Sequence, residues 1–334
     1  MNRTLIETFL NKALRDMHDA PERSIRNFIE LGTHFADGRF QKEFFEAAQT
    51  MLQDETSAYY RLVTDTIHNV NNSHLSAFIM NILYDSCTLA ARTIRQTEEK
   101  EHFDIPWSIY LHIDDQHFDV RREAYSEIFE NAKALGIHTF NLFTNKPEKL
   151  LPLASESLDC AFFLFCDPCT ITDSILYKLA AAHNVMPVIS FNDSDPQTAT
   201  ACAMLREQKI PYSVYMQYSN DDASQISDEY PWCDAEQMHA IMTIIIPKDH
   251  CSKKATHDVY QSIRKARHNQ EYATIPWDGV SDNCYMDSII SDRSCIIGFD
   301  ADGKAVTLHN GAPHPNVNLF HNDLKQIFKA YFEK

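Results

Sequence analysis

The spacing of hydrophobic and polar residues differs between the first part of this chain and the rest. Up to about residue 104 the apolar side chains recur every three or four positions, which is the spacing of helices with one buried face. The predicted helices cover residues 3–17, 21–36, 42–53, 57–70 and 72–101. We therefore predict a helical N-terminal region over residues 1–104.

After Pro106, short apolar runs rich in β-branched and aromatic residues alternate with helical patterns. The predicted strands cover residues 107–113, 137–143, 160–166, 185–191, 211–218 and 240–247. Their starts lie 23 to 30 residues apart, which is the length of one strand, one helix and two loops. Six βα units are therefore expected in succession.

The helices between these strands carry recognisable ends. Apolar residues fall three or four apart up to Gly136, which supplies a C-terminal stop, and Asp195 and Pro196 fit an N-cap and a first turn. Strands that are apolar on both faces and joined by helices predict a parallel sheet covered by helices. Six sequential units favour an α/β fold with a partial (β/α)6 barrel over residues 105–271; a doubly wound open sheet is the alternative.

The pattern changes again over residues 272–334. Asp302 and Gly303 lie between two apolar runs, which is a strong signal for a β-hairpin turn. An amphipathic pattern over residues 322–334 predicts a terminal helix. We therefore predict a C-terminal extension that contains a hairpin and a helix.

Charge and hydropathy exclude several classes of partner. The 334 residues include 47 acidic and 30 basic side chains, and the net charge of -17 repels phosphate backbones and anionic membrane surfaces. No run of 18 apolar residues occurs, and the N-terminus lacks the apolar core and cleavage site of a signal peptide. We expect a cytoplasmic protein that binds neither nucleic acid nor membranes.

Cysteine and glycine usage narrows the chemistry. The nine cysteines are scattered and several lie inside apolar runs, so we expect thiols and no disulfides. Only 7 glycines occur, and neither GxGxxG nor GxxxxGK[ST] is present. Both facts argue against a Rossmann or Walker nucleotide site.

Several segments resemble the radical S-adenosylmethionine (radical SAM) enzymes, in particular a bacterial subgroup with a helical lead-in and a C-terminal extension. The segments are HFDIPWSIYL, DCAFFLFCDPCTITDS, NVMPVISFND, LREQKIPYSVYMQYSND and FDADGKAVTLH. The resemblance covers roughly residues 55–330 and rests on spacing and apolar framework. It implies a partial (β/α) barrel of the radical SAM type.

The residues that handle the cofactors in that family are replaced here. The resemblance implies a CxxxCxxC loop after the first strand, which binds a [4Fe-4S] cluster, but this chain has HIDDQHFD there. The family's Gly-Gly-Glu-Pro stretch is Thr144, Asn145, Lys146 and Pro147, and His309 stands where members often have a cysteine for a second cluster. We therefore expect a degenerate relative that has no [4Fe-4S] cluster of the usual kind and no cofactor.

Polar residues follow the predicted strands, and loops at these strand ends converge in parallel βα folds. We predict that they line a ligand pocket at the barrel mouth, without assigning a catalytic role to any of them. The predicted pocket residues are Asp114, Asp115, Asn145, Lys146, Asp167, Asn192, Asp193 and His250.

Imidazoles and thiols near the mouth suggest a metal site for Zn²⁺ or Fe²⁺. The candidate ligands are His112, His117, Cys166 and Cys169. A solvated polar loop, a cysteine at a strand end and an Asp-Pro turn would explain the same residues without a metal. His309, His314 and His321 form a second candidate, with ordinary loop residues as the alternative.

Two hypotheses for function remain, and the sequence does not decide whether the chain is an enzyme. The first is a radical-SAM-like protein that acts as a non-catalytic binding, accessory or regulatory subunit, with a peptide or an active radical SAM homologue as partner. The second is a Zn- or Fe-dependent hydrolase or lyase. It would use His117 with Asp114 or Asp115, and Lys146 as an electrophilic or basic group.

Overall fold

The computed structural model describes residues 3–36, 38–191, 196–226, 230–248, 250–291, 293–306 and 317–333. Its strands are β1 (Ser108–His112), β2 (Thr139–Phe143), β3 (Ala161–Cys166), β4 (Val185–Ser190), β5 (Ser213–Tyr218), β6 (Met242–Pro247), β7 (Ile275–Asp278), β8 (Ile297–Phe299) and β9 (Ala305–Val306). They form one sheet in the order β7-β6-β5-β4-β3-β2-β1-β8-β9.

The six predicted strands are confirmed as β1 to β6. Neighbouring strands in this series follow one another in sequence order, whereas a doubly wound sheet reverses its order at a switch point, so the barrel-type arrangement is the correct alternative. The structure adds two parallel strands from the predicted C-terminal extension: β7 pairs with β6, and β8 pairs with β1. The predicted hairpin is confirmed, because β8 and β9 are antiparallel and Gly303 has a φ of 79° in their turn.

The N-terminal region is helical, as predicted. Its helices are α1 (Arg3–Asp19), α2 (Pro21–Phe35), α3 (Arg39–Met51), α4 (Ala58–Asn69), α5 (Asn72–Ile79), the π-helix η1 (Met80–Ala90) and α6 (Ala91–Glu101). The single helix expected over residues 72–101 is thus interrupted by wider π-helical turns, a feature that apolar spacing does not reveal.

Helices also connect the strands, and one helix follows the last strand. They are α7 (Phe118–Leu135), α8 (Pro147–Ala154), the 3-10 helix η2 (Pro168–Thr170), α9 (Asp173–Ala181), α10 (Pro196–Glu207), α11 (Ala223–Ile226), α12 (Tyr230–Gln237), α13 (Lys253–Asn269), α14 (Ser281–Ile290) and α15 (Leu324–Phe332). As predicted, α7 ends at Gly136, whose φ of 95° is left-handed, and α10 begins at Pro196. The predicted N-cap Asp195 lies outside the described residues.

The chain divides into two compact units. Unit 1 comprises Met1–Ser76, Asp167–Ala180 and Pro187–Asp282, and unit 2 comprises Ala77–Cys166, Ala181–Met186 and Asn283–Lys334. Each unit combines segments that are distant in the sequence. The predicted three-part division of the chain stays a prediction.

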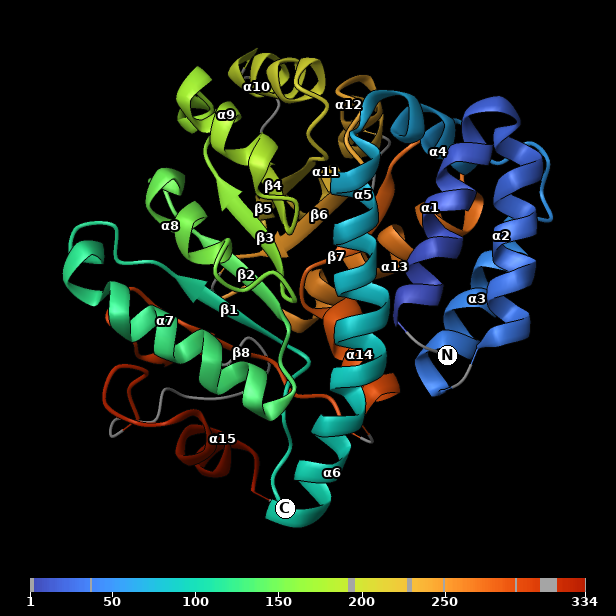
Figure 1. Ribbon diagram of the computed structural model, residues 1–334. Coiled ribbons are helices and arrows are strands. Elements are labelled where there is room, and N and C mark those ends of the chain that lie inside the picture. Colours follow the sequence, from blue (N-terminus) through green and yellow to red (C-terminus); the bar gives the residue numbers. More distant parts are fainter. Residues whose placement is uncertain are drawn as a thin grey trace. The chain divides into compact units, whose positions relative to one another are not determined.

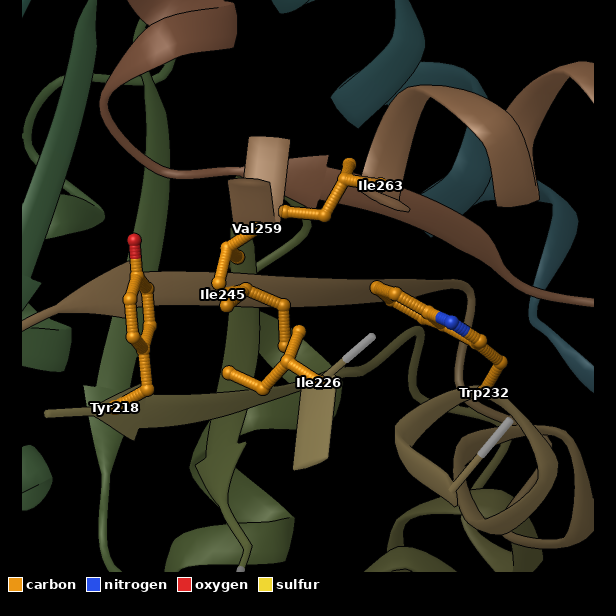
Figure 2. Packing of buried hydrophobic residues seen from close by; sticks show 6 residues of the cluster. All are labelled: Tyr218, Ile226, Trp232, Ile245, Val259 and Ile263. Carbon is orange, nitrogen blue, oxygen red and sulfur yellow. The ribbon is translucent and has the colours of Figure 1, made fainter. Parts of the chain in front are cut away.

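One core cluster of unit 1 joins β5 and β6 to three helices. Figure 2 shows its fully or nearly fully buried members, which are Tyr218, Ile226, Trp232, Ile245, Val259 and Ile263. Tyr218 and Ile245 come from the two strands, and the other four come from α11, α12 and α13. Their packing buries one side of α13 and fixes the helix beside the sheet.

In unit 2, α7 packs against β2 and β3 (Figure 1). The ring of Phe129 on α7 lies 4.7 Å from that of Phe140 and 5.4 Å from that of Phe162, measured between centroids. All three rings are buried. This contact packs the second half of α7 against the beginnings of the two strands.

Candidate functional site

The loop between β1 and α7 is organised by the carboxylate of Asp114. Its Oδ1 accepts hydrogen bonds from the backbone N–H groups of Gln116, at 3.2 Å, and His117, at 3.1 Å. The backbone N–H of Asp114 donates to the hydroxyl of Tyr125 on α7, at 3.1 Å. An aspartate that accepts from the next two or three N–H groups forms a turn of the kind that starts helices. Asp114 therefore shapes the entry into α7.

The second oxygen of Asp114 contacts two basic side chains of the same segment. Oδ2 lies 2.8 Å from Nδ1 of His117 and 3.0 Å from Nη1 of Arg121. Burial alone would raise the pKa of Asp114, but the hydrogen bonds from His117 and the charge of Arg121 bring this pKa below its ordinary value. The group is thus an ionised, fully bonded carboxylate.

The next residue, Asp115, joins this loop to the loop after β2. Its Oδ1 accepts from the hydroxyl of Thr144, and its Oδ2 accepts from the backbone N–H of Asn145 at 2.8 Å. The ammonium group of Lys146 lies 3.4 Å from the backbone oxygen of Asp115. The structure therefore brings together four of the predicted pocket residues in unit 2, which are Asp114, Asp115, Asn145 and Lys146.

Beside this network, three aromatic rings form a row across the ends of β1, β2 and β3. The imidazole of His112 stacks on Phe143 with centroids 4.6 Å apart, and Phe143 stacks on Phe165 with centroids 4.4 Å apart. His112, Phe143 and Phe165 are register partners, so their side chains lie on the same face of the sheet. His112 is exposed and Phe143 is half-buried. Phe165 is buried, so the row presents the imidazole of His112 and part of the Phe143 ring to solvent.

The remaining predicted pocket residues belong to unit 1 or lie outside the described residues. Asp167 accepts a hydrogen bond from the hydroxyl of Ser190 at 3.0 Å. His250 has a left-handed φ of 69°, and its backbone oxygen accepts from Asn220 at 3.3 Å. Asn192 and Asp193 are not among the described residues. That all eight residues share one pocket stays a prediction.

The four predicted metal ligands differ in exposure. His112 and His117 are exposed, Cys166 is buried at the end of β3, and Cys169 is exposed in η2. None of them belongs to a set of three or more His, Cys, Asp or Glu ligand atoms within 4.8 Å of one another, as far as the described residues go. A metal at the mouth stays a prediction, and His309 and His314 lie outside the described residues.

One group that meets this criterion was missed by the sequence analysis. It consists of His138, Asp159 and Cys160. These residues precede β2 and β3, whereas the sequence analysis followed only the loops after the strands. The signal was present, because residues that precede neighbouring parallel strands meet at the opposite edge of the sheet.

The loop after β1 does not fit a [4Fe-4S] cluster. Such a cluster needs thiolate ligands, and this loop offers only oxygen and nitrogen donors. In addition, both carboxylate oxygens of Asp114 and both of Asp115 already have protein partners. The contacts of the loop are those of a structural junction.

Within the described ranges, none of the helices combines the length and the apolar composition that crossing a bilayer requires.

Comparison with solved structures identifies the fold. The structure of SuiB from Streptococcus suis bound to S-adenosylmethionine matches with a TM-score of 0.50 and 12% sequence identity, over 70% of this chain and 66% of SuiB. The chain has the partial-barrel fold of radical SAM enzymes. At this identity the match shows the fold alone.

Two further structures are similar at lower scores. A second structure of S. suis SuiB gives a TM-score of 0.49 at 11% identity, over 90% of this chain and 77% of that one. Coproporphyrinogen III oxidase (HemN) from Escherichia coli, described as a radical SAM enzyme, gives 0.38 at 12% identity, over 65% and 67% of the two chains. No protein-family model matches the sequence, and no curated protein does.

Proposed function

We propose that this chain is a protein of the radical SAM fold that works without a [4Fe-4S] cluster, as a non-catalytic binding, accessory or regulatory subunit. The observation that carries the proposal is the bonding of the loop after β1. Asp114 and Asp115 use all four carboxylate oxygens to fix the start of α7 and the loop after β2. A loop bonded in this way holds the strand ends in place and leaves no thiolate for iron.

The surface beside this junction supports a binding role. The exposed imidazole of His112 stacks on the half-buried ring of Phe143, and Lys146 and the exposed His117 lie on the adjoining loops. Apolar area flanked by a few polar groups is typical of sites that bind peptides or small ligands. We propose a peptide segment, free or part of an active radical SAM homologue, as the partner.

Metal and sulfide content tests this proposal directly. We expect chain purified without oxygen to hold well under one iron atom and one acid-labile sulfide, also after incubation with iron and sulfide. We further expect S-adenosylmethionine to leave the melting temperature unchanged, whereas a ligand at about 100 times its Kd would stabilise the folded state by about 2.7 kcal/mol.

A cysteine variant separates adventitious iron from a cluster. If iron is bound loosely by the exposed thiol of Cys169, Cys169→Ser should reduce it without any change in a cluster spectrum. About four iron and four sulfide per chain, with a reducible cluster signal in electron paramagnetic resonance, would show that the proposal is wrong.

A second candidate function rests on the contact between Asp114 and His117. The carboxylate lies 2.8 Å from Nδ1 of His117, and the His117 side chain is 65% exposed. A carboxylate on one ring nitrogen fixes the tautomer and leaves Nε2 for a metal or a proton, as in many zinc sites. This arrangement favours the metal-dependent hydrolase or lyase as the alternative.

Zinc analysis distinguishes this alternative. If it holds, His117→Ala should contain about one zinc ion less per chain than the unaltered protein. The matched control is His257→Ala, because His257 is an exposed histidine on α13 in the other unit. Equal zinc content in the two variants would rule out a metal on His117.

A further inference from the structure

His138, Asp159 and Cys160 meet at the edge of the sheet where β2 and β3 begin. His138 directly precedes β2, and Asp159 and Cys160 directly precede β3. The two strands are parallel neighbours in which Thr139 pairs with Ala161. This register places the imidazole, carboxylate and thiol ligand atoms within 4.8 Å of one another.

The three side chains differ in exposure in a way that suits an ion arriving from solvent. The carboxylate of Asp159 is 48% exposed and the imidazole of His138 is 17% exposed, with Nδ1 3.6 Å from Oδ2 of Asp159. Cys160 is fully buried behind them. An ion could therefore meet the carboxylate first and the sulfur last.

The backbone that carries two of these ligands is held by a buried amide. Asn81 on η1 donates from Nδ2 to the backbone oxygens of Leu158, at 2.8 Å, and Cys160, at 2.7 Å. The N–H of Cys160 donates to the backbone oxygen of Ser157 at 3.0 Å. Such support around the ligands fixes their positions before an ion binds.

Three acidic side chains and one basic side chain act on the Cys160 thiol, so the net charge around it is negative. Lys133 lies 3.1 Å from Oδ1 of Asp159 and 3.1 Å from Glu130, which leaves Oδ2 of Asp159 turned toward His138. Burial raises the pKa of the Cys160 thiol, the charges of Asp159, Glu130 and Asp85 raise it further, and Lys133 opposes them. Three carboxylates against one ammonium favour an added cation.

We propose that His138, Asp159 and Cys160 form a binding site for a borderline divalent ion, Zn²⁺ by preference. Nitrogen, oxygen and sulfur donors together suit Zn²⁺, whereas Ca²⁺ and Mg²⁺ take oxygen donors. Zinc holds its ligands at about 2.0–2.3 Å, so the three atoms, which now lie within 4.8 Å of one another, must draw closer around it, with water as the fourth ligand. The ion replaces the thiol proton, which leaves to solvent as the sulfur–zinc bond forms.

Cobalt titration tests this site, because Co²⁺ bound to thiolate absorbs by charge transfer from sulfur. We expect one Co²⁺ per chain with this absorption, and its displacement by Zn²⁺. Cys160→Ala should lose the absorption. Cys202→Ala is the matched control, because Cys202 is another buried free thiol, on α10. Absence of the absorption in the unaltered chain, or its persistence in Cys160→Ala, overturns the proposal.

If Cys160→Ala does not fold, variants of Asp159 and Lys133 still test the proposal. Asp159→Asn should weaken Co²⁺ binding by about 10- to 100-fold. Lys133→Met should strengthen it severalfold, because Lys133 competes with the ion for Asp159. If the three residues form ion pairs with their neighbours and bind no metal, neither variant will bind Co²⁺, and the proposal is refuted.

The site is independent of the proposed function and of a metal on His117. We expect His117→Ala to keep the Co²⁺ absorption of Cys160, because His117 belongs to the loop after β1 and the new site lies before β2 and β3. Acid-labile sulfide and the cluster signal in electron paramagnetic resonance report on the cluster alone, so either proposal can fail without the other.

Discussion

Replacing Arg267 with leucine is expected to lower the free energy of unfolding by about 3–5 kcal/mol, because it leaves a buried carboxylate without its cation. Arg267 on α13 donates to both oxygens of Asp282, at 3.0 Å and 2.7 Å. The side chains are 18% and 4% exposed. The guanidinium also lies 5.7 Å from the ring centroid of Trp277, so packing is lost together with charge.

Urea unfolding measures this loss, and two variants calibrate it. Arg267→Lys keeps the charge but not the paired hydrogen bonds, so its loss should be smaller. Arg122→Leu removes an ion pair with Glu156 whose side chains are 44% and 50% exposed, and it should cost at most about 1 kcal/mol. If Arg267→Leu lowers the free energy of unfolding by no more than Arg122→Leu does, burial of the Arg267–Asp282 pair adds nothing to the stability of the protein.

Local patterns predicted most of the fold. The six strands of the βα units, the end of α7 at Gly136 and the turn at Gly303 follow from periodicity and from backbone conformations that glycine adopts readily. The strands β7 and β8 were not predicted as members of the sheet. They have four and three residues, and β8 pairs with β1 across more than 180 positions of sequence, so only tertiary structure selects them.

The sequence predicted which residues of the candidate site follow β1 and β2, but not the hydrogen bonds and ion pairs that hold them. The polar residues after β1 and β2 were identified from their positions at strand ends. The partners that fix them were not, because Arg121 and Tyr125 look like ordinary residues of an amphipathic helix until that helix is placed against the loop. The group of His138, Asp159 and Cys160 depends on the register of β2 and β3, which single-strand patterns do not specify.

The last prediction concerns Asp278 at the end of β7, which is expected to make the protein less stable as pH rises from about 4 to about 6. Burial raises the pKa of this carboxyl from 3.8 to about 6, against hydrogen bonds from the backbone of Ser281 and Val280 that lower it. Between these values the unfolded chain has lost the proton and the folded chain keeps it. The stability that this group contributes is therefore present below pH 3.8 and lost as pH rises through 6.

Asp278→Asn should remove this pH dependence. The amide oxygen can still accept from Val280, now bonded at 2.9 Å, and Ser281, at 2.6 Å, but it carries no charge. At pH 7 the variant should be more stable than the unaltered chain by up to about 3 kcal/mol, which corresponds to about two pKa units. The difference in urea unfolding free energy should vanish near pH 4.

Asp114→Asn is the matched control because its effect has the opposite sign. Hydrogen bonds from His117 and the charge of Arg121 outweigh burial and lower the pKa of Asp114, so its contribution is present above the ordinary pKa and is lost as pH falls through the lowered one. At pH 7 Asp114→Asn should therefore destabilise the protein and Asp278→Asn should stabilise it. If Asp278→Asn also destabilises the protein at pH 7, Asp278 is ionised in the folded protein without cost, and burial of the end of β7 does not determine its charge.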